Sequence, residues 1–349
     1  MFPSTTLSPA QKLTGLQLPN DWTVASMINK KPNTTGGHFS IGYLVKHKNG
    51  REAFLKAIDF SRAFAASDVS RELQDLTATY NFERDLLNKC RDKNLDRVVR
   101  AIEDGTVTID SLPVPYLIFE LANGDIRTHM DVSGKLDLAW TLRMLHQVAV
   151  GVKQLHGIGI AHQDLKPSNV LVFDESLISK LADLGRSAHL DYKPPQNDYI
   201  FAGAYGYAPP ELLYQFTHPD FRQRRFGCDT FLLGNIVLFA LTRETMTAVL
   251  MSHLAPEHKP VAWSGTYEDV LPYLQSAFNN ALSAIEFDLP VAVRNEILIM
   301  LRHLCEPDLS KRGHPRNHSK DGNNFSLERF VSKLNLLAYR TCLQLSDSS

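Results

Sequence analysis

The fold of this chain is decided by the stretch HQDLKPSNVLV at residues 162–172. It places a carboxylate at Asp164, an amine at Lys166 and an amide at Asn169, and it ends in an apolar strand. A second acidic turn, DLG at residues 183–185, follows 14 residues after Asn169. A carboxylate can accept a hydroxyl proton, an ammonium can neutralise a moving phosphoryl group, and Asn with Asp can hold a metal ion. The pattern therefore predicts metal-assisted transfer of a phosphoryl group to a hydroxyl.

These residues resemble the catalytic loop and metal-binding turn of the eukaryotic-type protein kinase family. The resemblance implies an α+β, bilobal fold, with an N-lobe of one antiparallel five-stranded sheet plus one helix and a mainly α-helical C-lobe. It implies that Asp164 is the catalytic base and that Lys166 neutralises charge on the γ-phosphoryl group. Asn169 and Asp183 would hold the metal. A lysine two residues after the base is the signature of the serine/threonine-specific members.

Composition excludes several other classes of protein. The 349 residues suit one bilobal domain or two modest ones, and the net charge of −1 predicts neither a nucleic-acid nor a membrane partner. The four cysteines are scattered and form no CxxC pair, which favours a reducing cytoplasm over disulfides or a zinc site. The N-terminus lacks the features of a secretion signal. The apolar run 231–241 is predicted to be a core helix, since it is too short to span a bilayer.

Upstream of the loop, residues 22–28, 41–47 and 52–58 have the composition of strands. Asn49-Gly50 is a strong hairpin signal, so the three segments are predicted to form a meander. The third segment contains Ala53-Phe54-Leu55-Lys56, which is similar to the V-A-I-K strand of the family.

A helix is predicted from Asp68 to Cys90, because apolar residues recur there at steps of three and four. Glu83 fills a gap in that apolar stripe. Burying an unpaired carboxylate costs several kcal/mol, so we predict that Glu83 pairs with Lys56. The alternatives are a Glu83 that reaches solvent at the edge of the stripe and an ordinary solvated lysine.

The loop TTGGHFS at residues 34–40 lies where the family has its glycine-rich phosphate loop. Gly36 and Gly37 are predicted to let the backbone approach the phosphates of ATP, and an ordinary hairpin loop is the alternative. Phe54 stands where the family has an Ala against adenine, and Gly42 stands where it has a Val. We expect this to be an exchange of bulk between neighbouring strands that preserves the adenine slot.

Two or three further strands are predicted over residues 98–119, and the last leads into a segment that resembles the family hinge. The resemblance implies that the backbone from Glu120 to Ala122 binds adenine. His162 is predicted to be a packed core residue that supports the loop. The resemblance also implies two scaffold contacts: Glu211 with Arg312, and Asp229 with the catalytic-loop backbone.

Two departures from the family pattern bear on the catalytic loop, and a basic run bears on substrate choice. Gln163 replaces the usual Arg, so we expect activity without phosphorylation of the activation segment. Ala204 replaces the usual Thr that links the base to Lys166, so that link is expected to be absent or replaced. The basic residues at 222–225 are typical of a solvated face, and an alternative is that they favour acidic substrates.

We therefore predict an ATP- and Mg²⁺-dependent protein kinase, with Mn²⁺ as a substitute metal, acting on Ser or Thr hydroxyls of protein substrates including itself. One alternative is a pseudokinase scaffold, which the eroded glycine loop, Phe54 and Ala204 would suit. Another is a small-molecule kinase of the aminoglycoside or choline type, which shares Asp-x(4)-Asn; Lys166 and Arg312 favour protein substrates. The oligomeric state stays open. The predicted boundaries are a flexible leader at 1–20, an N-lobe at 21–120, a C-lobe at 121–340 and a tail at 341–349.

Overall fold

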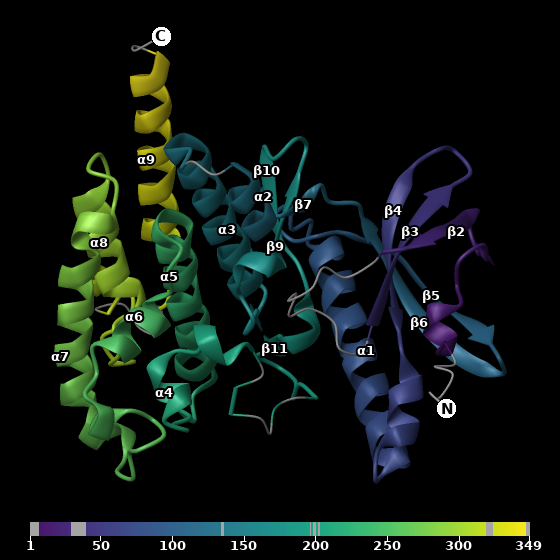
Figure 1. Cartoon of the computed structure of the whole chain (residues 1–349), viewed down its shortest axis with the longest axis horizontal. Coiled ribbons are helices and arrows are strands. Elements are labelled where there is room, and N and C mark those ends of the chain that lie inside the picture. Colours follow the sequence, from purple (N-terminus) through teal and green to yellow (C-terminus); the bar gives the residue numbers. More distant parts are fainter. Residues whose placement is uncertain are drawn as a thin grey trace, which may run out of the picture. The chain divides into compact units, whose positions relative to one another are not determined.

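The structure is a computed structural model that describes residues 7–28, 40–133, 136–195, 197, 200–201, 203–318 and 324–346. The chain divides into two compact units, Met1–Asn123 and Gly124–Ser349. The division falls three residues after the predicted N-lobe boundary at residue 120. The larger sheet and one α-helix lie in the first unit, the other α-helices lie in the second, and the predicted fold class of a protein kinase is confirmed (Figure 1).

Among the described residues, the first unit forms a six-stranded antiparallel sheet in the order β1-β2-β3-β4-β6-β5. Alternation decides which face is buried: in β4, Ala53, Leu55 and Ala57 are buried, and Phe54 and Lys56 between them are only partly buried. The strands are β1 (Gln17–Leu18), β2 (Trp22–Met27), β3 (Ser40–His47), β4 (Glu52–Ile58), β5 (Ala101–Ile109) and β6 (Leu112–Glu120).

The prediction of five strands is wrong by one, and the difference lies in the expected leader. Residues Gln17–Leu18 pair with β2, and a 3₁₀ turn precedes them at Pro9–Gln11. Leu13 is fully buried, and the Tyr43 hydroxyl donates to the Ala10 carbonyl at 2.7 Å. The prediction of a flexible leader is therefore wrong for residues 7–20, because these side chains complete the core beneath the sheet.

The helix of this unit, α1, spans Val69–Asp92 as the apolar stripe predicted. The side chain of Asp68 accepts a hydrogen bond from the Arg71 amide at 3.0 Å and caps its first turn. Its buried face includes Leu76, Tyr80 and Glu83, so the single acid of the stripe is indeed turned inward.

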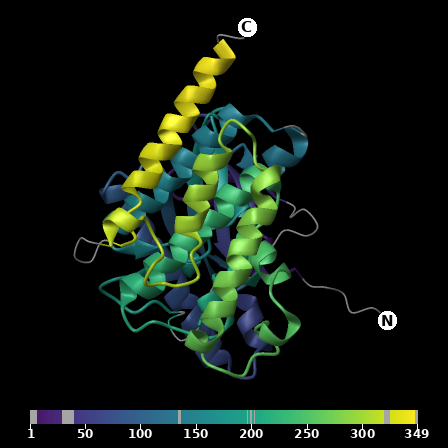
Figure 2. The same ribbon diagram turned by 90° about the vertical axis from the view of Figure 1, so that its left-hand side faces the viewer.

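The second unit is mainly helical. Helix α9 packs along α3, and its C-terminal end extends past the neighbouring helices (Figures 1 and 2). The helices are α2 (Ile126–Ser133), α3 (Leu138–Gly157), α4 (Pro210–Leu213), α5 (Gly227–Thr242), α6 (Met246–Ser252), α7 (Tyr267–Ile285), α8 (Arg294–Leu304) and α9 (Glu328–Ser346).

Helix α5 is apolar around nearly its whole circumference and forms the centre of this unit. A π-helical turn at Arg222–Phe226 precedes it, and the combined helix Arg222–Thr242 has the length and hydropathy of a membrane span. The apolar run 231–241 is thus part of a longer helix whose length does not exclude a membrane span. In its most apolar 18-residue window, 89% of the residues are buried, as expected for the predicted core helix.

Short strands position the loops of the second unit. β7 (Gly124–Asp125), β9 (Val170–Phe173) and β10 (Ile178–Leu181) form one sheet, and β8 (Ile160–Ala161) pairs with β11 (Ala188–His189). Val170 is the register partner of Leu181. Asn169 directly precedes Val170, and Ala182 directly follows Leu181, so both lie at the same end of the hairpin. There the Ala182 amide donates to the Asn169 carbonyl at 2.9 Å.

Candidate active site

Asp164 is the centre of a buried polar cluster in the second unit. Its Oδ2 accepts hydrogen bonds from Lys166 Nζ at 2.7 Å and from Asn169 Nδ2 at 3.1 Å. Its Oδ1 accepts from the backbone amide of Ala204 at 3.0 Å. The three residues that the sequence placed within one loop thus meet at one carboxylate.

The Ala204 contact answers the question raised by the missing threonine. A backbone N–H replaces the absent side-chain link to Asp164, while Lys166 reaches the carboxylate directly. Gly203 permits this approach, because a Cβ there would lie 2.5 Å from the Gln163 carbonyl oxygen and 3.1 Å from Asp164 Oδ1. No sequence signal identified the backbone donor.

Asp229 holds the backbone of the loop, as predicted. Its Oδ2 accepts from the His162 amide at 2.6 Å, and its Oδ1 accepts from the Gln163 amide at 2.8 Å. Burial by itself raises the pKa of Asp229, but bonds from His156 and Gln163 outweigh burial and hold it below its usual value. The ionised carboxylate thereby stabilises Gln163 in a left-handed conformation at φ 65°, directly before Asp164.

His162 joins the catalytic loop to the acidic turn. It is fully buried, its Nδ1 accepts from the Asp164 amide at 3.3 Å, and its Nε2 lies 3.1 Å from the Ala182 carbonyl oxygen. With Nδ1 accepting, Nε2 is the ring nitrogen that donates to the Ala182 carbonyl. The predicted role as a packed core residue is confirmed.

Asp183 begins the 3₁₀ turn Leu184–Arg186 in a left-handed conformation, φ 63° and ψ 76°. Holding an L-residue there costs on the order of 1–2 kcal/mol, offset here by the buried Leu184 and by the two bonds at Ala182. The Asn169 amide nitrogen donates to the Asp164 carbonyl oxygen at 2.8 Å, which directs its oxygen away from that loop.

The oxygen donors of Asn169 and Asp183 suit Mg²⁺ better than a metal ion that takes all its ligands from the protein. Within the described part of the chain, no group of three or more His, Cys, Asp or Glu side chains could hold a metal ion. Mg²⁺ typically uses one or two carboxylates and takes its other ligands from water and substrate phosphates. Asp183 with the Asn169 amide oxygen matches that requirement.

In the first unit, Lys56 and Glu83 form the predicted ion pair. Lys56 Nζ lies 2.8 Å from Glu83 Oε1 and 2.9 Å from Oε2. The Glu83 side chain is 4% exposed and the Lys56 side chain is 19% exposed. The carboxylate is therefore enclosed, while the ammonium keeps partial access to solvent.

Phe54 and Gly42 are in direct contact, as an exchange of bulk requires. A Cβ at Gly42 would lie 2.8 Å from Phe54 Cε2, so the phenyl ring occupies the space of the missing side chain. The ring also lies beside Phe119, with 6.4 Å between the ring centroids.

The other predicted nucleotide contacts are less defined by side chains. Glu120 Oε1 accepts a hydrogen bond from the Arg100 amide at 2.8 Å, within the first unit. The side chain is therefore already engaged, and the backbone is the part of Glu120 left to contact a ligand. Ala122 is partly buried two residues beyond β6. Gly36 and Gly37 lie outside the described residues.

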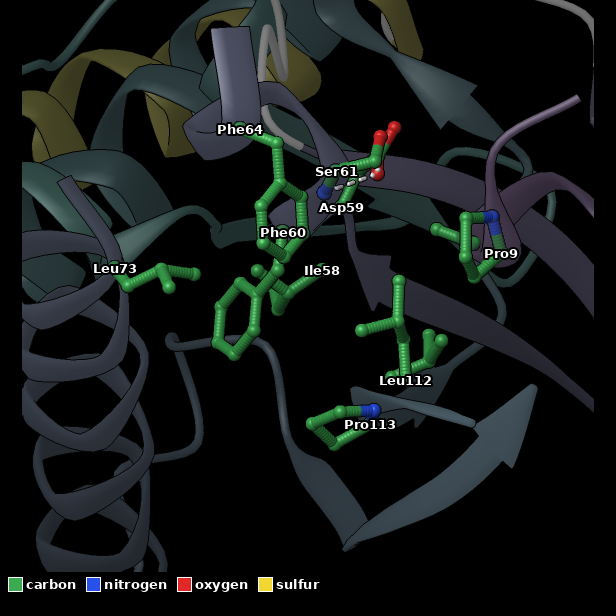
Figure 3. Close-up of a pocket in the computed structure, with 11 residues that line it drawn as sticks. Pro9, Ile58, Asp59, Phe60, Ser61, Phe64, Leu73, Leu112 and Pro113 are labelled. Atoms are coloured by element: carbon green, nitrogen blue, oxygen red, sulfur yellow. Dashed lines mark hydrogen bonds between the residues drawn. The ribbon is translucent and has the colours of Figure 1, made fainter. Parts of the chain in front are cut away.

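A cavity of about 170 Å³ in the first unit contains none of these residues (Figure 3). Its walls are almost entirely apolar, including Phe60, Phe64, Leu73 and Leu112, and the carboxylate of Asp59 is used to cap the amide of Ser61 at 3.0 Å. It offers no chemistry for phosphoryl transfer.

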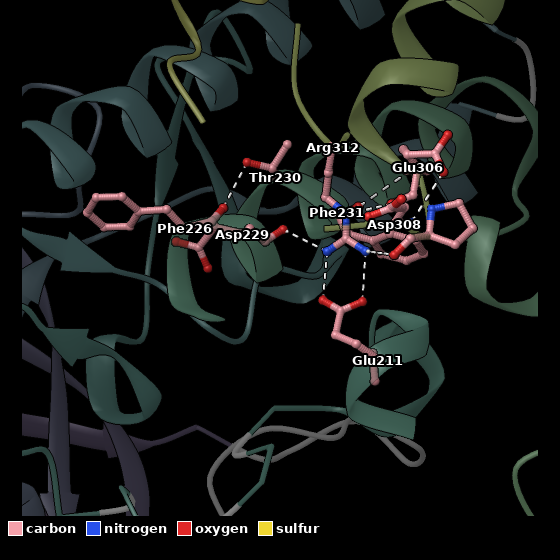
Figure 4. Close-up of polar contacts among 12 residues, drawn as sticks. Glu211, Phe226, Asp229, Thr230, Phe231, Glu306, Asp308 and Arg312 are labelled. Atoms are coloured by element: carbon pink, nitrogen blue, oxygen red, sulfur yellow. Dashed lines mark hydrogen bonds and ion pairs between the residues drawn. The ribbon is translucent and has the colours of Figure 1, made fainter. Parts of the chain in front are cut away.

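The second unit contains a closed scaffold pair between Glu211 and Arg312 (Figure 4). Both guanidinium nitrogens Nη1 and Nη2 lie 2.7 Å from the Glu211 oxygens. Arg312 also donates to the carbonyls of Glu306 at 2.8 Å, Gly227 at 3.1 Å and Pro307 at 3.3 Å. The predicted pair is confirmed. The three carbonyls accept further hydrogen bonds from the guanidinium.

The basic run 222–225 differs from the predicted solvated face. Arg222 is exposed, but Arg225 is buried and its Nη1 donates to Gln163 Oε1 at 3.1 Å. This contact was not predicted from the sequence. The one available signal was the coincidence of a neutral Gln163 with an arginine next to the apolar helix.

Comparisons with known proteins agree with this fold and site. A family model described as protein kinase domain matches residues 34–317. The chain is 26% identical over 245 residues to an Aurora kinase of Debaryomyces hansenii, covering 65% of this chain and 55% of that protein. It is 25% identical over 289 residues to a probable serine/threonine-protein kinase of Dictyostelium discoideum, covering 79% and 51%. Protein kinase MCK1 of Saccharomyces cerevisiae is 41% identical over 68 residues, covering 20% and 18%.

The antiparallel sheet unit, the helical unit and the cluster at Asp164 match the parts of a protein kinase domain. The chain belongs to the eukaryotic-type protein kinase family. It spans about half the length of the first two curated relatives it matches. The family implies ATP binding and use of a divalent metal.

Proposed function

We propose that this protein is a serine/threonine protein kinase that uses ATP and Mg²⁺. The observation that carries the proposal is the convergence of Lys166, Asn169 and the Ala204 amide on the Asp164 carboxylate. A carboxylate held on both oxygens is oriented to accept a proton from an incoming hydroxyl. Lysine at this position supports hydroxyl acceptors on Ser or Thr, and the relatives named as serine/threonine kinases support the same choice.

In the proposed reaction, the acceptor oxygen bonds to the γ-phosphorus as the bond to the bridging oxygen of ADP breaks. Asp164 takes the hydroxyl proton, and Lys166, held 2.7 Å from it, neutralises charge on the transferred group. Asn169 and Asp183 would hold Mg²⁺, or Mn²⁺ in its place, and the ion would neutralise phosphate charge when bound.

Lys56 would bind the nucleotide phosphates from its place beside Glu83. An ammonium held by a buried carboxylate needs no reorientation when an anion arrives, which lowers the cost of binding. The backbone from Glu120 to Ala122 would bind adenine beside the Phe54 wall. Gly36 and Gly37 would cover the phosphates.

The experiment is transfer of radiolabel from ATP to a casein-like protein, comparing wild type with Asp164→Ala. Loss of the base should lower the rate by about 10²–10⁴-fold. Asp131→Ala removes an exposed carboxylate of α2 in the same unit and should leave the rate unchanged. Equal rates in wild type and Asp164→Ala would remove Asp164 from the chemistry and favour a pseudokinase scaffold.

A second assay identifies the acceptor. Phosphoamino-acid analysis of the labelled protein should show phosphoserine or phosphothreonine, on the substrate and on the kinase itself. Small alcohols such as an aminoglycoside or choline should stay unlabelled. Label on the alcohol with none on protein would contradict the protein-directed assignment while leaving the phosphotransfer site intact.

A further inference from the structure

Arg225 is a buried cation at the end of the π-helical turn Arg222–Phe226. Arg225 is only 4% exposed to solvent. Nη1 donates to Gln163 Oε1 at 3.1 Å, and the Gln163 amide nitrogen donates back to the Arg225 carbonyl at 2.9 Å. Nη2 is buried and has no hydrogen-bond partner in the part of the chain that the structure describes. One edge of the guanidinium fork is thus left without an acceptor.

Asp229 attracts the Arg225 charge through space but forms no ion pair with it. Asp229 lies one helical turn further on, but its Oδ1 already accepts from the Gln163 amide and side chain, and its Oδ2 accepts from His162 and His156. No ion pair joins Arg225 to a carboxylate of any described residue. Burial, with a smaller effect from Arg224, lowers the pKa of Arg225 to about 10, so the side chain is still charged at neutral pH.

A second guanidinium adds to this positive charge. Arg224 is partly buried, and its Nη2 lies 3.5 Å from the Asn197 carbonyl oxygen of the activation segment. Burial lowers the pKa of this side chain as well. Arg224 repels Arg225, and a buried guanidinium that forms no ion pair, as Arg225 is, costs several kcal/mol. An oxyanion would relieve both costs, and the planar guanidinium fork matches a phosphoryl group.

We propose that Arg225, together with Arg224, forms a phosphate-binding site beside the catalytic loop. The ligand is a phosphoryl group whose oxygens accept from the Arg225 edge that has no partner. Because Arg225 also holds Gln163, the residue before Asp164, an occupied site would stiffen the loop that carries the proposed base.

The activation segment restricts where the phosphoryl group comes from. The activation segment, residues 183–211, contains no Thr and one Ser, Ser187, and its other hydroxyl side chains are tyrosines. Ser187 is buried, and its hydroxyl donates to the His162 carbonyl at 3.3 Å, so it is not an accessible acceptor. A serine/threonine kinase therefore cannot fill the site by modifying this segment on its preferred acceptors. The remaining sources are phosphate supplied from solution or by a phosphorylated ligand, and a phosphotyrosine of the chain itself.

This site changes the expectation drawn from Gln163. That expectation assumed that a neutral residue removes the buried positive charge next to the base. Arg225 returns a guanidinium to the same place from a different element, so a requirement for an anion is restored.

The test uses the full chain after phosphatase treatment, with intact mass confirming that no phosphate remains. Thermal unfolding is followed with inorganic phosphate against chloride at matched ionic strength, so that general screening cancels. Phosphate should raise the Tm of wild type by about 2–4 °C. It should do the same for Arg222→Gln, which removes an exposed arginine of the same turn, and it should not affect Arg225→Gln.

A second arm separates the sources. Untreated protein is analysed for phosphotyrosine, and the fall in Tm on phosphatase treatment is compared between wild type and Arg225→Gln. A fall in wild type alone supports the site and assigns the phosphoryl group to a tyrosine of the chain. Tyr192→Phe then tests the described, exposed candidate.

Arg225→Lys covers the case in which Arg225→Gln does not fold. It keeps the charge but loses the planar fork, so its response to phosphate should be weaker than that of wild type. The proposal is overturned if Arg225→Gln, or Arg225→Lys in its place, responds to phosphate and to phosphatase as wild type does. It is equally overturned if wild type responds in neither arm.

Discussion

Two carboxylate–cation pairs of this chain, one in each unit, have similar geometry and different surroundings. Lys56 and Glu83 meet at 2.8 and 2.9 Å in the first unit, and Arg312 and Glu211 meet at 2.7 Å in the second. Arg312 is fully enclosed and donates to three carbonyls as well, whereas Lys56 keeps 19% of its side chain exposed. The difference teaches that the Arg312 guanidinium is used up within the fold, whereas the Lys56 ammonium remains accessible to a ligand.

The sharpest way to break this comparison is Arg312→Ala. The change leaves the Glu211 carboxylate buried without its cation and should lower the free energy of unfolding by about 3–5 kcal/mol. Urea denaturation measures the effect. Lys311→Ala removes an exposed neighbour and should cost less than about 1 kcal/mol. Equal losses for the two variants would mean that enclosure adds nothing to the Arg312 pair.

Lys56→Met tests the other side of the comparison, where activity should change more than stability. Loss of a phosphate contact should lower kcat/KM on the order of 100-fold, equivalent to about 3 kcal/mol. The free energy of unfolding should fall by only about 1–2 kcal/mol, since the 19% exposure of Lys56 keeps this pair partly solvated. The matched control is Lys46→Met on β3, which removes a surface ion pair with Glu52. A variant with normal kcat/KM would make the Lys56 pair a scaffold pair too.

The wall beside Lys56 provides a smaller test. Gly42→Val should cost about 1–3 kcal/mol of stability, because the new side chain would overlap the Phe54 ring 2.8 Å away. Adding Phe54→Ala should recover most of that loss and leave ATP affinity unchanged. A double-mutant cycle on the Tm and the ATP Kd measures the coupling. Additive losses would show that the two positions do not exchange bulk.

The smallest expected effect is the pH dependence next to the Arg312 pair. Burial, with His314 and Arg302 adding repulsion, lowers the pKa of His303, and burial with Arg329 and Arg316 lowers that of His314. The unfolded chain therefore binds protons first as pH falls, so this stability is complete above about pH 6.5 and is lost as pH drops toward the lowered values.

Thermal unfolding across this window should show a fall in Tm that is smaller in His303→Gln than in wild type. His253→Gln, at an exposed histidine of the same unit, should follow wild type. If the Tm of wild type and of His303→Gln fell equally with pH, His303 would not contribute to the pH dependence of stability.

The local elements followed from patterns in the chain. Apolar steps of three and four placed α1, and the Asn49-Gly50 turn placed the β3–β4 hairpin, because each pattern acts between residues that are close in sequence. The acid inside the α1 stripe even indicated its partner, since burial of Glu83 demands a cation. Such signals failed for residues 7–20, whose prolines and small polar residues hid the buried Leu13 and Leu18.

The sequence by itself therefore determined the class of fold and the residues able to carry the chemistry: Lys56, Glu83, Asp164, Lys166, Asn169 and Asp183. Only the tertiary structure decided that the Ala204 amide replaces a missing hydroxyl and that Arg225 lies against Gln163. The physical reason is that a backbone donor has no residue-type signature. Likewise, the burial of Arg225 depends on which long-range neighbours enclose it, and the spacing of residues along the chain carries no record of those neighbours.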